Sequence, residues 1–486
     1  MLCFYETFLK MKKMTKNMTY PTVIQGGMGV YISNWELSRE VSILGGLGTI
    51  SGVMLERILA YKLQRGDLDG SVRRALSHFP YPEPVNKVMD AYFVEGGISK
   101  KSPFKAVSMY TIKPSELLIS LTVCANFAFV WLAKEGHDNP ISINYLEKVA
   151  MPHVCAITGA MLANVDFITM GAGIALHIPE VINAISEGRT AEYRVPVEGE
   201  NIKNWTMEFN PKTFFGSDLP MMVKPGFIPI ISSNSLASVF MTKLPPGSIY
   251  GFVVEEPSAA GHNASPRKLL RNDEGEPLPI YGSKDQVNYE MLALLGIPFW
   301  IGGSCASPER LKWALSVGAK GIQVGSIFAL SEESGLDSIL KRKARKLGFN
   351  KILEINTDMR ISPTGYPFKV AKIGGTISEH SVYKSRMRVC NQGGLVSLYE
   401  KSNGSIGYRC SAEPIDKFIS KDGDIKETIN RGCLCNALFS AANFNNPGEV
   451  PVVTLGDDLS FLSKLMTDED SLYYASDVIK YLIADL

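Results

Sequence analysis

One histidine lies in a loop of small residues, where its imidazole could exchange a proton with a bound molecule. His262 follows the run from Glu255 to Gly261, which itself follows a short apolar segment. The chain has six histidines, and this one does not belong to an apolar helical stripe. A neutral imidazole can take a proton from a carbon acid, and an imidazolium can donate one to a developing anion. A structural or solvated histidine is the alternative interpretation.

Two glycine–serine pairs follow later apolar segments, each just ahead of a predicted helix. The pairs are Gly303-Ser304 and Gly325-Ser326. In a (β/α)8 barrel the loops after strands seven and eight commonly bind a phosphate through backbone N–H groups and a helix N-terminus. The two pairs together predict a phosphate site, although ordinary turn formation would also explain each glycine.

A third glycine loop follows the first apolar segment. It contains Gly26, Gly27 and Met28 within the run from Gln25 to Gly29. Because glycine has no Cβ, the backbone here could approach a flat ring closely. A tight turn between a strand and a helix is the alternative.

Eight short apolar segments could position these loops. Most are continuous rather than alternating and most precede a helical pattern, as expected for parallel strands buried on both faces. This rhythm predicts parallel βα units, closed as a barrel or open as a doubly wound sheet. The segments are Val23–Gln25, Leu47–Ile50, Ile141–Asn144, Asp166–Met170, Ile228–Ile231, Gly251–Glu255, Phe299–Gly302 and Gly321–Gly325.

Helix-start signals fall between the segments. The run from Ser33 to Glu36 resembles a capping box, and the run from Ser307 to Glu309 combines a cap with a first-turn proline and acid. Asp285 is predicted to open a helix that extends to Leu295 and is closed by Gly296.

The chain, at 486 residues, is longer than one ordinary domain. The predicted fold is α/β: a (β/α)8 TIM barrel with a helical insertion after strand 2 and a C-terminal α+β extension. A β-hairpin is expected from Tyr193 to Phe209. The predicted divisions are a flexible N-terminal segment (1–20), the (β/α)8 barrel (21–54 and 141–348), the helical insertion (55–140) and the cysteine-containing extension (349–486).

The composition gives no reason to expect a nucleic-acid or membrane partner. Lys and Arg number 50 against 49 Asp and Glu, and the net charge of +1 provides no basic field. Residues 1–20 lack the pattern of a signal peptide, and no apolar run of the roughly eighteen residues that span a membrane stands out. The eight cysteines are scattered, which is typical of a reducing compartment. A cytoplasmic protein with a small-molecule substrate is therefore expected.

Four of the cysteines lie in the extension: Cys390, Cys410, Cys433 and Cys435. Four thiols could form a tetrahedral metal site. Only Cys433 and Cys435 are close in sequence, as Cys-x-Cys, so reduced structural thiols are the favoured interpretation and no metal is expected.

Taken together, the motifs resemble the nitronate monooxygenase family, also called 2-nitropropane dioxygenases, which are FMN-dependent barrel enzymes. The resemblance extends from about residue 20 to 345. The extension is similar to longer members and to the enoyl reductases that accompany polyunsaturated fatty acid and polyketide synthases. The matching stretches are Val23–Gly29, Ala125–His137, Ile141–Lys148, Gly159–Ile174, Pro229–Asn234, Val253–Arg267, Ile297–Ser304, Gly321–Ser334 and Ser362–Val370.

The resemblance implies that FMN binds at the carboxyl ends of the strands, with His262 as the active-site histidine. The residues implied to line or contact the flavin ring are Gly26, Gly27, Met28 and Asn144. The residues implied to hold the FMN phosphate are Gly303, Ser304, Gly325 and Ser326.

The sequence departs from the family pattern at two positions. The family's Ala-Gly-Gly-His is Ala-Ala-Gly-His at residues 259–262, and its Gly-Gly after strand seven is Gly303-Ser304. The methyl group of Ala260 is expected to narrow the pocket. Ser304 keeps its N–H for a phosphate, provided that its φ is one that serine tolerates.

By this resemblance the chain would oxidise alkyl nitronates or nitroalkanes with O2 to carbonyl compounds and nitrite, with His262 as general base. An NAD(P)H-dependent enoyl-thioester or quinone reductase is the alternative, and an acyl-carrier protein would then be a partner. A non-catalytic scaffold subunit is a third hypothesis. A homodimer is compatible with each of them.

Overall fold

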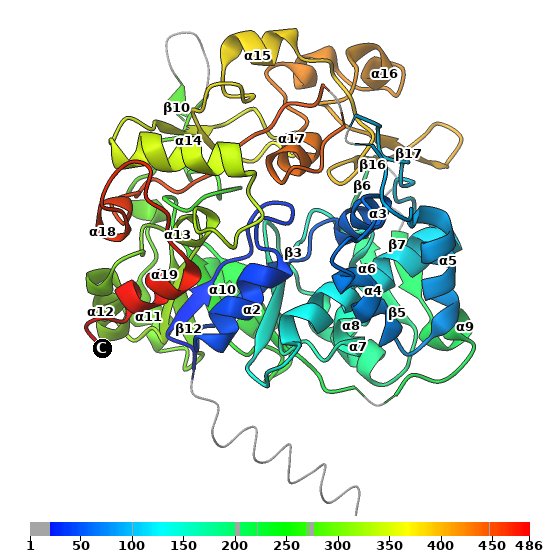
Figure 1. Cartoon of the computed structure of the whole chain (residues 1–486), viewed down its shortest axis with the longest axis horizontal. Coiled ribbons are helices and arrows are strands. Elements are labelled where there is room, and N and C mark those ends of the chain that lie inside the picture. The colour runs from blue at the N-terminus through cyan, green and yellow to red at the C-terminus, as the bar shows by residue number, and fades with distance from the viewer. Residues whose placement is uncertain are drawn as a thin grey trace, which may run out of the picture.

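The structure is a computed structural model, and its described part comprises residues 20–99, 101–199, 205–220, 222–268, 270–271, 277–446 and 448–486. The predicted flexible segment, residues 1–20, lies outside this part except for Tyr20. In Figure 1 the strands of a barrel and the helices of the first half of the chain lie below, and the yellow and orange elements of the extension lie above.

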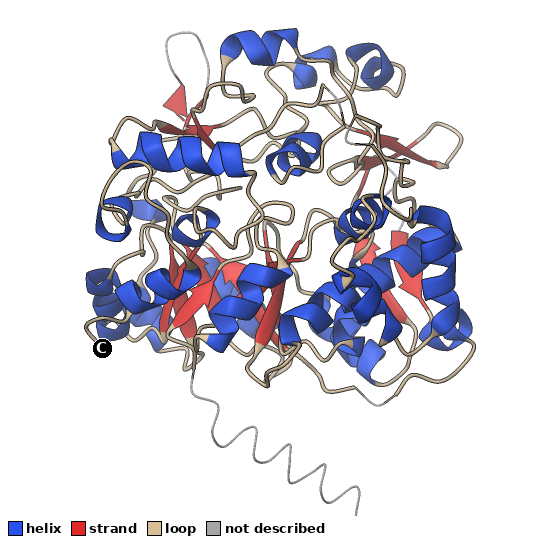
Figure 2. Cartoon of the chain, in the orientation of Figure 1, coloured by secondary structure: helices blue, strands red, loops and turns tan. Residues whose placement is uncertain are grey.

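Eight parallel strands of the described chain form one closed sheet. They pair in the order β1-β13-β12-β9-β8-β4-β3-β2, and a bridge from Ile24 to Leu47 joins the two ends. The closed barrel is therefore confirmed and the open sheet is wrong, and each predicted apolar segment overlaps one strand. Figure 2 draws the strands in red and the helices in blue. The strands are β1 (Val23–Gln25), β2 (Gly48–Ser51), β3 (Ile141–Leu146), β4 (Phe167–Gly171), β8 (Gly226–Ile231), β9 (Phe252–Glu255), β12 (Phe299–Gly302) and β13 (Gly321–Val324).

Large apolar side chains fill the amino-terminal end of the barrel. Trp300, fully buried, donates from its indole nitrogen to the carbonyl oxygen of Pro21 at 2.6 Å. It packs with Ile24, Leu47, Phe167, Ile228 and Val253 in one buried cluster. At the opposite end, β4 and β12 end in glycine, and glycine directly follows β1 and β13. This is the end at which barrel enzymes place their sites.

Helices follow the strands, and their starts test the predicted caps. Ser307 caps α12 as predicted, by accepting from Arg310 N at 3.2 Å. Ser33 was expected to cap α2, but the cap is Asn34, whose Oδ1 accepts from Leu37 N at 2.9 Å. The helices are α2 (Trp35–Ile43), α7 (His153–Leu162), α8 (Ile178–Ser186), α10 (Asn234–Lys243), α11 (Tyr289–Ala293), α12 (Pro308–Ser316), α13 (Ser326–Ala329) and α14 (Ser338–Phe349).

The helix predicted from Asp285 to Leu295 is shorter than expected. Asp285 ends a 3-10 turn, η1 (Ser283–Asp285), and α11 begins only after its cap, Asn288. The Asp285 carboxylate instead accepts from Arg267 N and Gly282 N, both at 2.8 Å. An acid that could cap a helix therefore holds a loop together.

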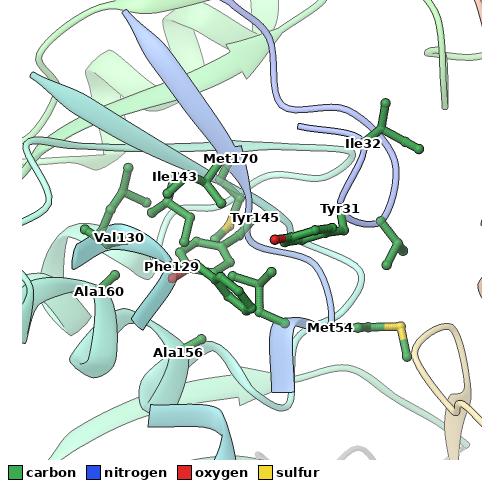
Figure 3. Close-up of a cluster of buried hydrophobic side chains, with 14 of the residues drawn as sticks. Tyr31, Ile32, Met54, Phe129, Val130, Ile143, Tyr145, Ala156, Ala160 and Met170 are labelled. Atoms are coloured by element: carbon green, nitrogen blue, oxygen red, sulfur yellow. The ribbon is translucent and has the colours of Figure 1, made fainter. Parts of the chain in front are cut away.

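Helices occupy the region between β2 and β3, as predicted. They are α3 (Leu55–Gln64), α4 (Ser71–Ser77), α5 (Pro82–Tyr92) and α6 (Glu116–Lys134). Among the described helices, α6 alone is long and apolar enough to span a membrane, although no such run was expected from the sequence. However, 78% of its apolar stretch is buried inside the protein. Figure 3 shows why: Phe129 and Val130 of α6 pack among Tyr31, Ile143 and Tyr145.

The hairpin expected from Tyr193 to Phe209 is present as an antiparallel pair, β5 (Ala191–Val195) with β7 (Trp205–Phe209), although part of its turn lies outside the described residues. β6 (Val197–Glu198) pairs instead with β16 of the extension. The remaining short elements before the extension are α9 (Pro211–Phe215), β10 (Leu270–Arg271) and β11 (Pro277–Leu278).

The extension has mixed helices and strands, as predicted, and it packs back on the barrel. Its last helix, α19, lies against α2 near the start of the chain. Its elements are β14 (Ile355–Asp358), β15 (Phe368–Ala371), α15 (His380–Ser385), β16 (Ser397–Glu400), β17 (Ile406–Arg409), α16 (Ile415–Ile419), η2 (Ile425–Thr428), α17 (Leu434–Ala441), α18 (Leu462–Leu465) and α19 (Ala475–Leu482).

Candidate functional site

Two adjoining cavities open at the carboxyl ends of the barrel strands. We call the first the inner cavity, and its walls include the glycine loops after β1, β12 and β13. The second, the histidine cavity, is lined by His262 and Asn144. Gly27, Glu255 and Gln323 line both cavities, so a molecule that fills one also contacts the wall of the other.

Every residue predicted for the site lines one of these cavities. The inner cavity is lined by Gly26, Gly27, Met28, Gly303, Ser304, Gly325 and Ser326. The histidine cavity is lined by Gly27, Asn144 and His262. Residues far apart in the sequence thus converge on one place, as the barrel topology requires.

Buried polar side chains hold the loop after β1. The Ser33 hydroxyl donates to Gly26 O and accepts from Met28 N, both at 2.9 Å. Gln25 is fully buried, and its Nε2 donates to Ser33 Oγ at 2.9 Å. Ser33, which was expected to start a helix, therefore fixes the shape of the glycine loop instead.

The position of Gly27 accepts no side chain. A Cβ there would lie 2.6 Å from Nδ2 of Asn144. Asn144 in turn accepts from Thr169 Oγ1 at 3.0 Å through its Oδ1, which leaves the amide nitrogen as a donor on the cavity side. The pair provides a flat wall with one hydrogen-bond donor, which suits the edge of a heteroaromatic ring.

The loops after β12 and β13 provide backbone N–H groups at the far end of the inner cavity. Gly303 and Ser304 both have positive φ, 111° and 47°. Gly325 precedes the short helix α13, and Ser326 Oγ accepts from Gly456 N at 2.8 Å. The Ser326 hydroxyl hydrogen is then left to donate to a ligand.

The inner cavity has no lysine or arginine among its described lining residues. A phosphate there would depend on backbone N–H groups and serine hydroxyls, which is how successive amides in such turns bind anions. Asp458 also lines this cavity, and its carboxylate accepts from Ser460 N at 2.9 Å. The donors at residues 303–304 and 325–326 therefore fit the phosphate of FMN, and the glycine wall at Gly27 fits its ring.

The extension supplies part of the cavity wall, which no sequence motif indicated. Thr454 accepts from Gly261 N at 2.8 Å through its hydroxyl, and Gly456 donates to Ser326 as described. Both residues line the inner cavity. The site is thus built from the barrel and from the last part of the chain.

His262 is held by the extension and is neutral at pH 7. Its Nε2 shares a hydrogen bond of 2.7 Å with Ser362 Oγ, and Ser362 shares another of 2.7 Å with Thr364. The ring meets Phe368 edge-on at 4.9 Å. Burial, with the nearby charge of Lys148, lowers the pKa of His262 from 6.5 to about 4. The imidazole can therefore accept a proton at neutral pH.

Glu255, the last residue of β9, is a second titratable group on the wall. It lines both cavities, and its carboxyl has no hydrogen-bond partner among the described residues. Burial raises the pKa of Glu255 from 4.5 to about 8, so the carboxyl is protonated at pH 7. In the sequence Glu255 is recognisable only as the first residue of the histidine loop, although the carboxyl end of a barrel strand is itself a signal.

We expect Glu255→Gln to stabilise the flavin-free protein increasingly as the pH rises. Between pH 4.5 and 8 the folded state keeps a proton that the unfolded state releases, so this carboxyl weakens the fold as pH rises through that window. The variant should gain about 2–4 kcal/mol in the free energy of unfolding at pH 8 and little at pH 4.5. Urea unfolding at both pH values measures the difference; a gain that does not grow with pH would contradict a buried neutral carboxyl.

Ser304 is the serine whose backbone φ decides whether it is tolerated in the turn after β12. It adopts the left-handed conformation. With φ at 47°, serine is tolerated at a cost of about 1 kcal/mol. We expect Ser304→Gly to change the free energy of unfolding by less than about 1 kcal/mol, because relief of strain is offset by the greater freedom of unfolded glycine. Ser304→Val should lose about 2 kcal/mol or more, because a β-branched residue resists positive φ. Urea unfolding of both variants checks this; equal losses would show that the turn is not strained.

The four cysteines of the extension lie close enough for their thiols to influence one another's pKa. Cys390 and Cys410 are hydrogen-bonded through their sulfurs, which lowers the pKa of Cys390 and raises that of Cys410. These two, with Cys433 and Cys435, are free thiols. In the part of the chain that the structure describes, no group of three or more His, Cys, Asp or Glu side chains could hold a metal ion.

Comparison with known proteins identifies no family for this chain. No family model matches the chain, and no curated protein matches it. Among solved structures, FabK from Thermotoga maritima is 14% identical with a TM-score of 0.47, over 96% of this chain and 92% of that one. A nitroalkane oxidase from Streptomyces ansochromogenes is 11% identical with a TM-score of 0.45, over 96% of each chain. The enoyl reductase domain of MlnA from the macrolactin biosynthesis cluster of Bacillus amyloliquefaciens is 11% identical with a TM-score of 0.48, over 97% and 95%.

Proposed function

We propose that this chain is an FMN-dependent oxidoreductase that oxidises alkyl nitronates or nitroalkanes with O2 to carbonyl compounds and nitrite. The observation that carries the proposal is the convergence of the glycine loops and His262 on two adjoining cavities. One cavity offers a turn of N–H donors for a phosphate beside a wall without side chains. The other places a neutral imidazole next to that wall.

The chain's own residues would hold FMN without a cationic side chain. The amides at residues 303–304 and 325–326, with the hydroxyl of Ser326, would bind the phosphate. Gly27 would lie against the ring, and the amide nitrogen of Asn144 would donate to its edge. When bound, FMN would supply the redox chemistry by accepting an electron from the nitronate and passing it to O2.

His262 would take the proton from the carbon that bears the nitro group. The base must be neutral to do so, and burial keeps it neutral. The hydrogen bond to Ser362 and the edge contact with Phe368 fix the plane of the ring. The nitronate anion that forms beside the ring stabilises the positively charged imidazolium. The proton affinity of His262 therefore rises only when substrate is bound.

Absorption spectroscopy of the purified protein, before and after reconstitution with FMN, tests the proposal. A flavin spectrum is expected, followed by bleaching when a nitronate is added under nitrogen and by nitrite release in air. A flavin that is not bleached at saturating nitronate would reject the nitronate reaction. Protein that stays colourless after reconstitution would favour a scaffold role.

A reductase that uses NAD(P)H and an enoyl thioester or quinone is the second candidate. It is favoured by a third cavity, the outer cavity, which is bounded by the start of α3, the turn after β3, the hairpin and the extension. The outer cavity shares Met54, Val149 and Leu395 with the histidine cavity, so a long substrate could extend through both. Rapid bleaching by NADPH alone would support this candidate, and an acyl-carrier protein would then be a partner.

A further inference from the structure

Lys148 presents an unpaired positive charge at the junction of the outer and histidine cavities. It lines the outer cavity, and its neighbour Val149 lines both cavities. In the described part of the chain its ammonium group makes no hydrogen bond and has no carboxylate within 4 Å; it lies over the ring of Tyr366, 3.5 Å from the centroid. Its charge is nevertheless close enough to His262 to lower the pKa of that imidazole.

Burial lowers the pKa of Lys148, and the charge of the adjacent Glu147, which lines the same cavity, offsets this only in part. Glu147 accepts from the Tyr193 hydroxyl at 3.4 Å, and its side chain lies against Gly173. Burial raises the pKa of Glu147, which weakens its charge further. An ammonium group that is partly removed from water and has no partner is costly, and a bound anion would remove that cost.

Apart from Glu147, the other charged groups of the outer cavity are already engaged, and Glu56 lies 3.8 Å from Arg57. Arg57 donates to the carbonyl oxygens of Val107 and Ser108, at 2.8 and 3.1 Å. Glu198 pairs with Arg409 at 2.9 Å. Lys148 is therefore the cation of this cavity that remains available to a ligand among the described residues.

The rest of the outer cavity suits an aliphatic chain. Its described lining includes Met54, Val149, Met151, Leu395 and Leu398. An apolar chain on these side chains would be removed from water, while a carboxylate on the same molecule would reach Lys148.

We propose that Lys148 binds the carboxylate of an aliphatic substrate, whose chain occupies the outer cavity and whose reacting carbon lies beside His262. The position of the reacting carbon rests on the proposed function, whereas the carboxylate site does not. The ion pair would select acids over uncharged molecules of the same shape and would place the substrate along the path between the two cavities.

Octanoate and octanamide, which have the same chain but differ in charge, test the proposal by calorimetry on the full-length protein. Octanoate should bind at least about tenfold more tightly than octanamide, as expected for one partly buried ion pair. Lys148→Met should abolish that preference, and Lys148→Arg should keep it. Equal binding of the two probes by the wild type, or a preference that survives Lys148→Met, would overturn the proposal.

Lys62→Met is the matched control. Lys62 also lies over a tyrosine ring, 5.1 Å from the centroid of Tyr31, but pairs with Glu36 at 3.8 Å. This variant should keep the preference for octanoate. If Lys148→Met does not fold, Lys148→Gln removes the charge with a polar side chain and takes its place.

Binding should be measured with and without FMN, so that the two proposals can fail separately. Protein that binds no flavin but prefers octanoate through Lys148 would reject the proposed function alone. Protein that binds and reduces flavin but does not distinguish the two probes would reject the carboxylate site alone. As a readout independent of turnover, the His262 pKa followed by NMR should rise in Lys148→Met, because a repelling charge has been removed.

Discussion

Replacing His262 by asparagine is expected to leave the flavin bound and to slow turnover of neutral nitroalkanes by about 10²–10⁴-fold, the range that general-base catalysis supplies. Preformed nitronates have already lost the proton, so their turnover should fall much less. The comparison of kcat/KM for the two substrate forms therefore isolates the proton transfer from the redox step. Equal losses on both forms would contradict a general-base role.

His380→Asn is the control for this experiment, because His380 is exposed on α15 and lines neither the inner nor the histidine cavity. It should turn over both substrates like the wild type. Ser362→Ala should give an intermediate loss on nitroalkanes, because it keeps the imidazole but removes the hydrogen bond that orients it. A Ser362→Ala loss as large as that of His262→Asn would indicate that the imidazole leaves the cavity without this contact.

Replacing Gly325 by leucine is expected to weaken FMN binding by at least about 100-fold, because the side chain would occupy the place of the phosphate. A Cβ at Gly325 would meet only Met28, with its sulfur at 3.5 Å, which is an ordinary contact. Its φ of −116° is open to any residue. The fold should therefore survive, and the protein should be purified without colour and with an almost unchanged free energy of unfolding.

Gly282→Leu is the matched control, since a Cβ there would meet nothing within 4 Å and its φ is −114°. It should bind FMN normally. Gly27 is unsuitable for this test, because any side chain there would displace Asn144. A loss of FMN binding could then come from damage to the fold as well as from a blocked site. Full flavin binding by Gly325→Leu would mean that the phosphate does not bind at this turn.

The barrel could be predicted from the sequence because its signals are local. Parallel strands buried on both faces give continuous apolar runs, and the residue after each run marks the carboxyl end. Because the strands of a barrel are parallel, their carboxyl ends lie at the same end, and Gly26, Asn144 and Gly325 line the cavities there. The ligand roles of these residues stay predictions, as do the division of the chain into domains, the cytoplasmic location and the homodimer.

The rest depended on contacts that sequence spacing does not reveal. Ser33 has the right neighbours for a helix cap, but its hydroxyl instead forms hydrogen bonds with the backbone of the glycine loop, at Gly26 and Met28. Nothing in the sequence marks Glu255 as unusual, because it is burial in the folded barrel that raises its pKa to about 8. The partner of His262, Ser362, lies in the extension, and only tertiary packing brings the two together.

Gly456 lines a site that begins at Gly26, and Ser362 hydrogen-bonds to His262 of the same site. The order of synthesis therefore constrains when the complete site can form. A nascent chain that has just released the whole barrel from the ribosome still lacks the hydroxyl that orients His262. Translation of the remaining segment takes about 10 s or more at ordinary elongation rates. During that interval the glycine loops would be open to water, so the chain cannot acquire its reactivity before its last part has folded onto the first.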